Sequence, residues 1–251
     1  MAPLAALMND GTLGDYFAGI WTKNLRFCLA WHRVNSLLTA PKTYRAPSFS
    51  WASVDGQIGS SILHLSETLM QDQALDASWI DEFGPRLLEQ HMVLKDPSQP
   101  YGEVKEGLHL VLEACLVGLA KGLTVIRDHD IFHPTIVLDQ SDAFDCPYCN
   151  PTQSTDEGRR EATRELDNSI EHHVCMIVQG DGWKGRESVC EFLILRHMGE
   201  EGSYVRVGFG MPSLGHGYQA VWENEDKGFN AEPVRKLFGG MGWERRQIKL
   251  L

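Results

Sequence analysis

Hydrophobic positions at roughly helical spacing characterise the beginning of the chain. Apolar side chains between residues 16 and 31 recur about every three or four positions, and Asp15 stands where a helix cap is expected. Pro41 ends this pattern, because proline is poorly tolerated within a helix. We therefore predict a helical segment over residues 12–40.

Short apolar or alternating runs dominate the rest of the chain. Residues 42–58 alternate in the manner of a strand and end at the turn signal Asp55-Gly56. Several short strands at such spacing are typical of an antiparallel sheet or barrel. The fold class predicted is α+β: an antiparallel, barrel-like β-sheet with a packed N-terminal helical segment. The other strand-like runs are 107–119, 123–127, 134–138, 173–179, 189–197 and 203–210.

Polar stretches separate and follow these runs. The polar, proline-containing residues 73–106 predict a loop with a short helix near 83–92. The 251 residues suffice for one good core, so we expect a single domain over 1–251. Its parts are the β-rich body (42–138 and 173–210), an exposed polar excursion (140–171), a glycine-rich hairpin end or lid (208–217) and a C-terminal tail (230–251) with a short helix near 231–238.

Charge and composition exclude several classes of function. The chain has 23 Lys and Arg against 34 Asp and Glu, a net charge of −11. Binding to nucleic acid or to an anionic membrane needs clustered basic residues, so neither partner is expected. Residues 1–14 lack the pattern of a signal peptide, and no apolar run is long enough for a transmembrane helix. We expect a cytoplasmic protein with a small-molecule substrate, and a homodimer stays open.

Residues 44–56, YRAPSFSWASVDG, form the most distinctive string in the chain. It resembles the "RAPSWSWAS-DG" signature found downstream of the HET domain in fungal heterokaryon-incompatibility (HET) proteins. Three further segments resemble the same family in the same order. They are DYFAGIWTKNLRFCLAW (15–31), PYGEVKEGLHLVLEA (100–114) and CEFLILRHMGEEGSYVRVGFG (190–210).

The resemblance implies a fungal, intracellular protein. The HET domain of the family resembles TIR-type signalling domains and is taken to trigger cell death. This chain is expected to stand alone without that domain, since its first helix is expected about fifteen residues after Met1. The resemblance therefore does not imply incompatibility activity. Small proteins of such families are often recruited into fungal secondary metabolism, which sets an expectation by analogy.

Cys146 and Cys149 have the CxxC spacing that holds zinc or forms a redox disulfide. A zinc site needs two further ligands, and the second half-site HHxC supplies them as His173 and Cys175, beside His172. A structural zinc there would hold both ends of the polar excursion. A redox disulfide and plain loop cysteines are the alternatives, and the spacing does not decide among them.

Aromatic and basic residues are dense in the N-terminal half. One interpretation is an aromatic pocket with a few inward polar groups, the usual form of a small-molecule site. The other is architectural: Trp51 lies in the core, and the serines of the motif bond to nearby backbone. The first interpretation assigns catalytic roles to His32, Arg45, Tyr44, His64 and His109, and substrate binding to Trp21, Trp31, Trp51, Arg26 and Ser50.

Motifs for common cofactors are missing from the sequence. There is no GxGxxG after a strand, no P-loop, no HExxH and no GxSxG, so no organic cofactor is expected. The leading hypothesis is a cofactor-independent isomerase or cyclase that closes a ring in a hydrophobic, oxygenated metabolite. The alternative is a non-enzymatic interaction or regulatory module derived from an incompatibility protein. A zinc-stabilised scaffold is a third possibility.

Overall fold

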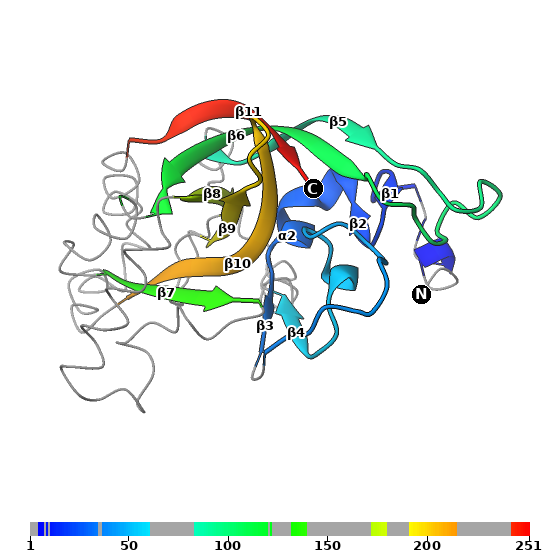
Figure 1. Cartoon of the computed structure of the whole chain (residues 1–251), viewed down its shortest axis with the longest axis horizontal. Helices are drawn as coiled ribbons and strands as arrows, with labels where there is room; N and C mark the ends of the chain where they lie inside the picture. Colours follow the sequence, from blue (N-terminus) through cyan, green and yellow to red (C-terminus); the bar gives the residue numbers. More distant parts are fainter. Residues whose placement is uncertain are drawn as a thin grey trace, which may run out of the picture.

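A closed ring of five β-strands forms the body of the fold (Figure 1). The structure, a computed structural model, describes residues 5–7, 9, 11–34, 37–60, 83–119, 121, 132–139, 172–179, 191–214 and 242–251. The predicted fold class, α+β with a barrel-like antiparallel sheet, is confirmed. In order around the ring lie β6 (His109–Gly118), β8 (His173–Gln179), β9 (Glu191–His197), β10 (Ser203–Leu214) and β11 (Glu244–Leu250).

Closure of the ring depends on β11, which pairs with β6 over seven residue positions and with β10 over two. The β10–β11 pairing is parallel, while the other pairings in the ring are antiparallel. A bulge between Arg206 and Gly208 shifts the register of β10 against β9, and such bulges bend a strand. Outside the ring, β5 (Arg86–His91) pairs with β6, and β7 (Phe132–Leu138) pairs with β10.

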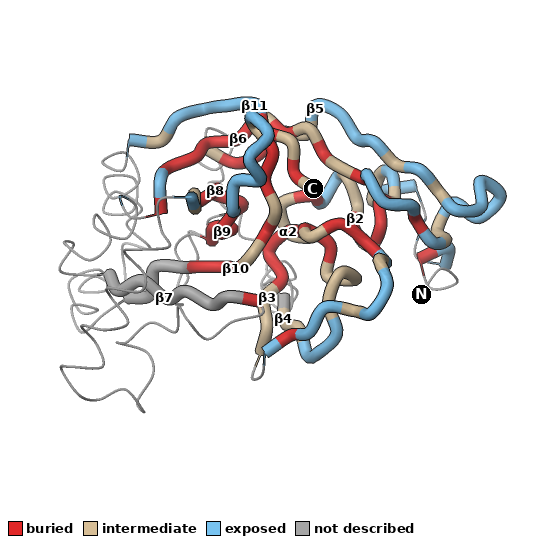
Figure 2. Tube along the Cα trace, viewed as in Figure 1, coloured by how far each residue is buried: buried red, intermediate tan, exposed pale blue. Residues whose placement is uncertain are grey.

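The buried residues of the barrel strands mark the core, and exposed residues lie along the outer strands (Figure 2). Alternation between the two faces is clear on β6. On β6 the core residues are Leu110, Leu112, Ala114 and Leu116, and the residues between them occupy the other face. On β11, Ile248 and Leu250 are buried in the same core. The strand-like runs predicted at 107–119, 134–138, 173–179, 189–197 and 203–210 correspond to β6, β7, β8, β9 and β10.

The helical segment predicted over 12–40 is wrong over most of its length. A hairpin of β1 (Tyr16–Phe17) and β2 (Ile20–Trp21) comes first. Ala18 and Gly19, at its turn, have positive φ values of 48° and 99°, which a right-handed helix does not allow. After it come η1 (Thr22–Asn24), the five-residue α2 (Leu25–Leu29), which packs against β8, and β3 (Trp31–Arg33).

The strand predicted over 42–58 is also wrong. This segment consists of turns and the 3-10 helix η2 (Trp51–Ser53), and only at its end does β4 (Ile58–Ser60) pair with β3. The Ser50 hydroxyl accepts a hydrogen bond from the Ala52 amide at the start of η2. A serine in this position favours a helical turn over a strand, because its side chain satisfies a backbone donor locally.

Two further strands replace predicted irregular structure. Residues 86–91 form β5 rather than a short helix, and a bulge between Leu87 and Glu89 interrupts its alternation. The end of the predicted tail is β11, and the predicted lid at 208–217 is a continuous strand as far as Leu214. The excursion 140–171, the run 123–127 and the helix near 231–238 lie outside the described residues. In the part that is described, no helix is long and apolar enough to cross a membrane.

Candidate functional site

The RAPSFSWAS motif, residues 45–53, forms hydrogen bonds both to the N-terminal hairpin and to the barrel. Ser50 has no exposed surface, and its hydroxyl donates to the carbonyl of Ala18. The indole of Trp51 donates to the carbonyl of Gly19 at 2.8 Å. A Cβ on Gly19 would lie 3.0 Å from both the Ser50 hydroxyl and the Trp51 nitrogen. The motif therefore packs so closely against the turn of the hairpin that a side chain at position 19 would crowd Ser50 and Trp51.

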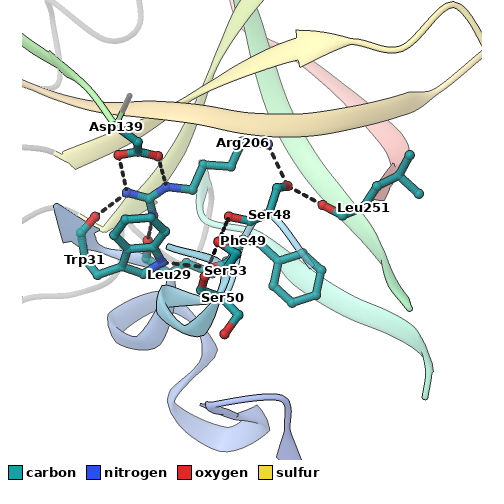
Figure 3. A network of polar contacts seen from close by, with 9 residues as sticks. All are labelled: Leu29, Trp31, Ser48, Phe49, Ser50, Ser53, Asp139, Arg206 and Leu251. Carbon is teal, nitrogen blue, oxygen red and sulfur yellow. Dashed lines mark hydrogen bonds and ion pairs between the residues drawn. The ribbon is translucent and has the colours of Figure 1, made fainter. Parts of the chain in front are cut away.

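A second group of contacts joins the motif to β10 and β11. The Ser48 hydroxyl donates to the backbone oxygen of Leu251 and accepts from the Arg206 amide at 2.9 Å. The Arg206 guanidinium pairs with Asp139 at 3.1 Å and donates to the carbonyls of Leu29 and Trp31. In Figure 3 the contacts of Asp139, Leu29 and Trp31 converge on this buried guanidinium. Burial lowers the pKa of Arg206, and Asp139 opposes that shift.

These contacts give the motif an architectural role. Trp31 is 2% exposed, stacks on Arg206 and donates from its indole nitrogen to the Phe49 carbonyl at 2.8 Å. Trp31 and Ser50 therefore contact protein and have no surface for a substrate, contrary to the binding roles predicted for them. Trp51 is half-buried and uses its N–H on Gly19. Buried indoles need such acceptors, which explains why these tryptophans are directed at backbone.

The residues predicted to be catalytic lie in separate environments. His32, on β3, stacks on Phe209 with ring centroids 5.2 Å apart. Arg45 is exposed and forms an ion pair with Asp55 at 2.8 Å. Tyr44 packs against the core, and burial, with a smaller effect of the Glu106 carboxylate, raises the pKa of its phenol. The structure does not bring these three side chains together as one site.

His109 lies on the outer face of β6, where it stacks on His91 of β5 with ring centroids 4.3 Å apart. It is therefore directed away from the barrel core. Trp21 packs edge-on against Tyr16, and its centroid is 6.4 Å from that of Tyr101. No ring contact among the described residues joins Trp21, Trp31 and Trp51 into one wall. Arg26 is half-buried on α2, and His64 lies outside the described residues.

Of the predicted zinc ligands, only His173 and Cys175 fall in the described part of the chain. Both lie on β8 and share one face of that strand, because they are two residues apart. Cys175 is a free thiol, and burial raises its pKa. Among the described residues no group of three His, Cys, Asp or Glu is placed to hold a metal. Cys146 and Cys149 lie outside those residues, so the zinc hypothesis stays a prediction.

A cavity of about 130 Å³ opens where β6 ends and where β8 and β11 begin. We call it the barrel mouth. Its lining is Leu116, Val117, Gly118, Lys121, Val174, Tyr204, Gly242, Glu244 and Arg246. We call the three larger apolar residues of this lining, Leu116, Val117 and Val174, its apolar floor. Glu244 and Arg246 share the face of β11 that carries Ile248 and Leu250 into the core, because side chains alternate along a strand.

Polar groups of several kinds converge on the mouth. Tyr204 is 7% exposed, its ring stands edge-on to His197, and its hydroxyl bonds to no other described residue. Arg246 donates to Glu244 from Nε at 3.0 Å and from Nη2, and this carboxylate raises the pKa of Arg246. The Lys121 ammonium lies over Gly242, where an added Cβ would be 2.5 Å from Nζ. The mouth thus combines a phenol, an ammonium and a carboxylate with an apolar floor.

No protein-family model, curated protein or solved structure matches this chain. A functional inference therefore rests on the geometry of the chain itself.

Sequence reasoning missed the residues of the mouth. Tyr204 was part of a strand-like run, but nothing in that run showed which face would meet a cavity. Glu244 and Arg246 lie in the predicted tail, although the polar positions 244 and 246 and the apolar positions 248 and 250 share one face of a strand. Lys121 has no motif around it. Its place depends on how β6 ends beside the start of β11, a long-range pairing that local sequence does not encode.

Proposed function

We propose that the protein is a cofactor-independent isomerase or cyclase acting on a hydrophobic, oxygenated small molecule. The observation that supports this function is the barrel mouth, where Tyr204, Lys121 and Glu244 surround one apolar floor. Apolar pockets with a few convergent polar groups are the usual small-molecule sites, and barrel mouths are a frequent place for them. The resemblance to HET proteins supports a fungal, cytoplasmic setting in secondary metabolism as part of the same proposal.

The size of the mouth limits what enters it. A cavity of about 150 Å³ is known to bind benzene, and the mouth measures about 130 Å³. It therefore accommodates one ring or a short chain, and the rest of a larger substrate would extend into solvent. This arrangement suits an enzyme that activates one end of its substrate.

The polar groups suit a proton shift beside a carbonyl group. In the proposed step, the Glu244 carboxylate removes a proton from carbon, and the C–H electron pair forms an enolate double bond while the carbonyl π pair moves to oxygen. The Tyr204 hydroxyl and the Lys121 ammonium donate hydrogen bonds to that oxygen as its charge develops. With a β,γ-unsaturated ketone the enolate is conjugated with the C=C bond, so Glu244 can return the proton to the γ-carbon. The oxygen pair re-forms the carbonyl, the enolate double bond shifts to Cα=Cβ, and the former Cβ=Cγ pair forms the new C–H bond. All atoms and electrons are conserved, so no oxidant or reductant is required.

The test follows from this conservation of atoms. The purified full-length protein is incubated without cofactor with a panel of hydrophobic unsaturated ketones and acids, and products are sought that keep the mass but change in chromatographic retention. Gly118→Leu should abolish such conversion, because a Cβ on Gly118 meets no atom within 4 Å and the larger side chain would fill the mouth. Tyr204→Phe should lower kcat by about 100- to 1,000-fold, as loss of one donor to a developing oxyanion does.

Matched variants separate this outcome from misfolding. Tyr101→Phe removes a phenol hydroxyl that accepts from Asn9 at 2.6 Å, away from the mouth, and should leave conversion unchanged. Thermal unfolding should show that Gly118→Leu retains the fold. The proposal is wrong if no compound in the panel is converted, or if conversion survives Gly118→Leu.

The interaction module is a second candidate, favoured by the exposed strand β5. Leu88 is 50% exposed on this strand and Val93 is 51% exposed just after it. Among the described residues β5 pairs only with β6, and an outer strand can add a segment of a partner. Substitution separates the two candidates: Leu88→Lys should abolish the cellular activity of an interaction module, whereas Gly118→Leu should abolish that of an enzyme.

A further inference from the structure

The balance of charge in the barrel mouth indicates which ligand it would accept. Glu244 receives two N–H donors of Arg246, so this carboxylate is already neutralised by a neighbour. The Lys121 ammonium forms no ion pair with any other described residue. Among the described residues, the lining of the mouth therefore carries two cations and one carboxylate, in a chain whose net charge is −11.

The Lys121 side chain places its ammonium group at the cavity, over Gly242. A Cβ added to Gly242 would lie 2.5 Å from Nζ of Lys121. The lysine side chain therefore passes over this glycine and forms part of the lining of the cavity. Gly242 has a φ of 67°, a conformation that glycine adopts readily and that favours the absence of a side chain here. The ammonium of this exposed lysine is thus placed over Gly242, within the lining of the mouth.

Arg246 and Tyr204 supply further donors on the same side. A guanidinium has five N–H donors, and two of those on Arg246 go to Glu244. Tyr204 contributes a hydroxyl that bonds to no other described residue. A carboxylate accepts several hydrogen bonds at once, so it matches this set of donors better than a neutral carbonyl does.

We propose that the barrel mouth selects an anionic ligand, a carboxylate attached to an aromatic ring or a short apolar chain. This inference rests on the proposed function, because it names the substrate class of the same site. In it, the carboxylate lies against Lys121 and the free donors of Arg246, while the apolar part contacts Leu116 and Val174.

The experiment compares benzoate with benzamide, which has nearly the same shape but no charge. Binding to the full-length protein is followed by NMR titration. Benzoate should bind about tenfold more tightly, which corresponds to about 1.4 kcal/mol. Raising the salt concentration from about 0.01 M to about 1 M shortens the Debye length from about 30 Å to about 3 Å. It should therefore weaken the binding of benzoate and leave that of benzamide nearly unchanged.

Three variants locate the effect. Lys121→Met should abolish the preference for benzoate, whereas Lys105→Met, which removes an exposed lysine on the loop before β6, should preserve it. Gly118→Leu should abolish binding of both probes by filling the mouth.

Each contrary result has its own meaning. Equal binding of both probes, or a benzoate preference that survives Lys121→Met, overturns the anionic ligand but leaves a small-molecule site at the mouth. Failure of both probes to bind overturns the site and with it the proposed function.

Discussion

The guanidinium carbon of Arg206 lies 3.4 Å from the ring centroid of Trp31, in a part of the core that solvent does not reach. The stacking comes with an ion pair to Asp139 and hydrogen bonds to two backbone carbonyls. A desolvated contact between a cation and an aromatic face is worth about 2 kcal/mol. This one side chain therefore connects β10 to α2, to β3 and to the residue that follows β7.

Removal of Arg206 should be among the most damaging single changes in the chain. In Arg206→Met the Asp139 carboxylate stays buried without its partner, and breaking a buried ion pair costs about 3–5 kcal/mol. The free energy of unfolding, measured with urea, should fall by that amount. Arg245→Met is the control, since its pair with Glu113 is partly exposed and worth about 0–1 kcal/mol. Equal effects of the two variants would contradict the central role of Arg206.

In the motif that resembles HET proteins, substitution of a buried residue should lower the free energy of unfolding more than substitution of an exposed one. Ser50→Ala removes the partners of the Ala18 carbonyl and the Ala52 amide, and should cost about 1–3 kcal/mol. Arg45→Ala breaks an ion pair whose side chains are 43% and 54% exposed, and should cost less than about 1 kcal/mol. Chemical denaturation of both variants measures the difference. A larger loss for Arg45→Ala would mean that the motif is not held by its buried serine.

The sequence predicted the barrel strands well because their short runs are apolar or alternating, and both patterns favour a strand. The predicted run 189–197 corresponds to β9, which is buried at five consecutive positions, so it indicates a strand without telling its two faces apart. The N-terminal segment was mispredicted because the turn at Ala18 and Gly19 is set by contacts with Ser50 and Trp51, more than thirty positions away. The same reason applies to the barrel mouth. Tyr204, Glu244 and Lys121 meet only through strand pairing, which a local pattern of residues does not contain.

Gly210 should be intolerant of even a methyl group. A Cβ there would lie 2.3 Å from Cε2 of Phe192, its partner across the β9–β10 pair and only 1% exposed. Gly210→Ala should therefore cost about 1–3 kcal/mol through overpacking. Gly118→Ala is the matched control, because its added Cβ meets nothing within 4 Å.

A double-mutant cycle tests whether the stability lost in Gly210→Ala comes from a clash with the Phe192 side chain. Phe192→Leu creates space beside the new methyl group, so the double variant should be more stable than the sum of the single losses implies, by about 0.5–3 kcal/mol. Strict additivity in urea denaturation would show that the strain at Gly210 arises elsewhere.

Asp96 should titrate at a lower pH than an ordinary aspartate. The Ser98 hydroxyl and amide donate to its carboxylate at 2.8 Å and 2.9 Å, with a further bond from Gln99, and these bonds lower its pKa. A carboxyl whose pKa is depressed in the folded state stabilises the fold above its unfolded pKa of about 3.9. That contribution is lost as the pH falls through the lower folded value, so this turn should weaken only in acid below about pH 4.

Carbon-detected NMR titration of the Asp96 carboxyl measures this shift directly. Ser98→Ala should raise the pKa of Asp96 only part of the way, because the amide of residue 98 still donates. Glu103 provides an internal comparison, since Lys95 rather than a serine lowers its pKa, through an ion pair at 2.7 Å. Ser98→Ala should leave Glu103 unchanged, whereas added salt should raise the pKa of Glu103, because exposed ion pairs are screened. If Asp96 has an ordinary pKa in the unmodified protein, the turn is not held by these hydrogen bonds in solution.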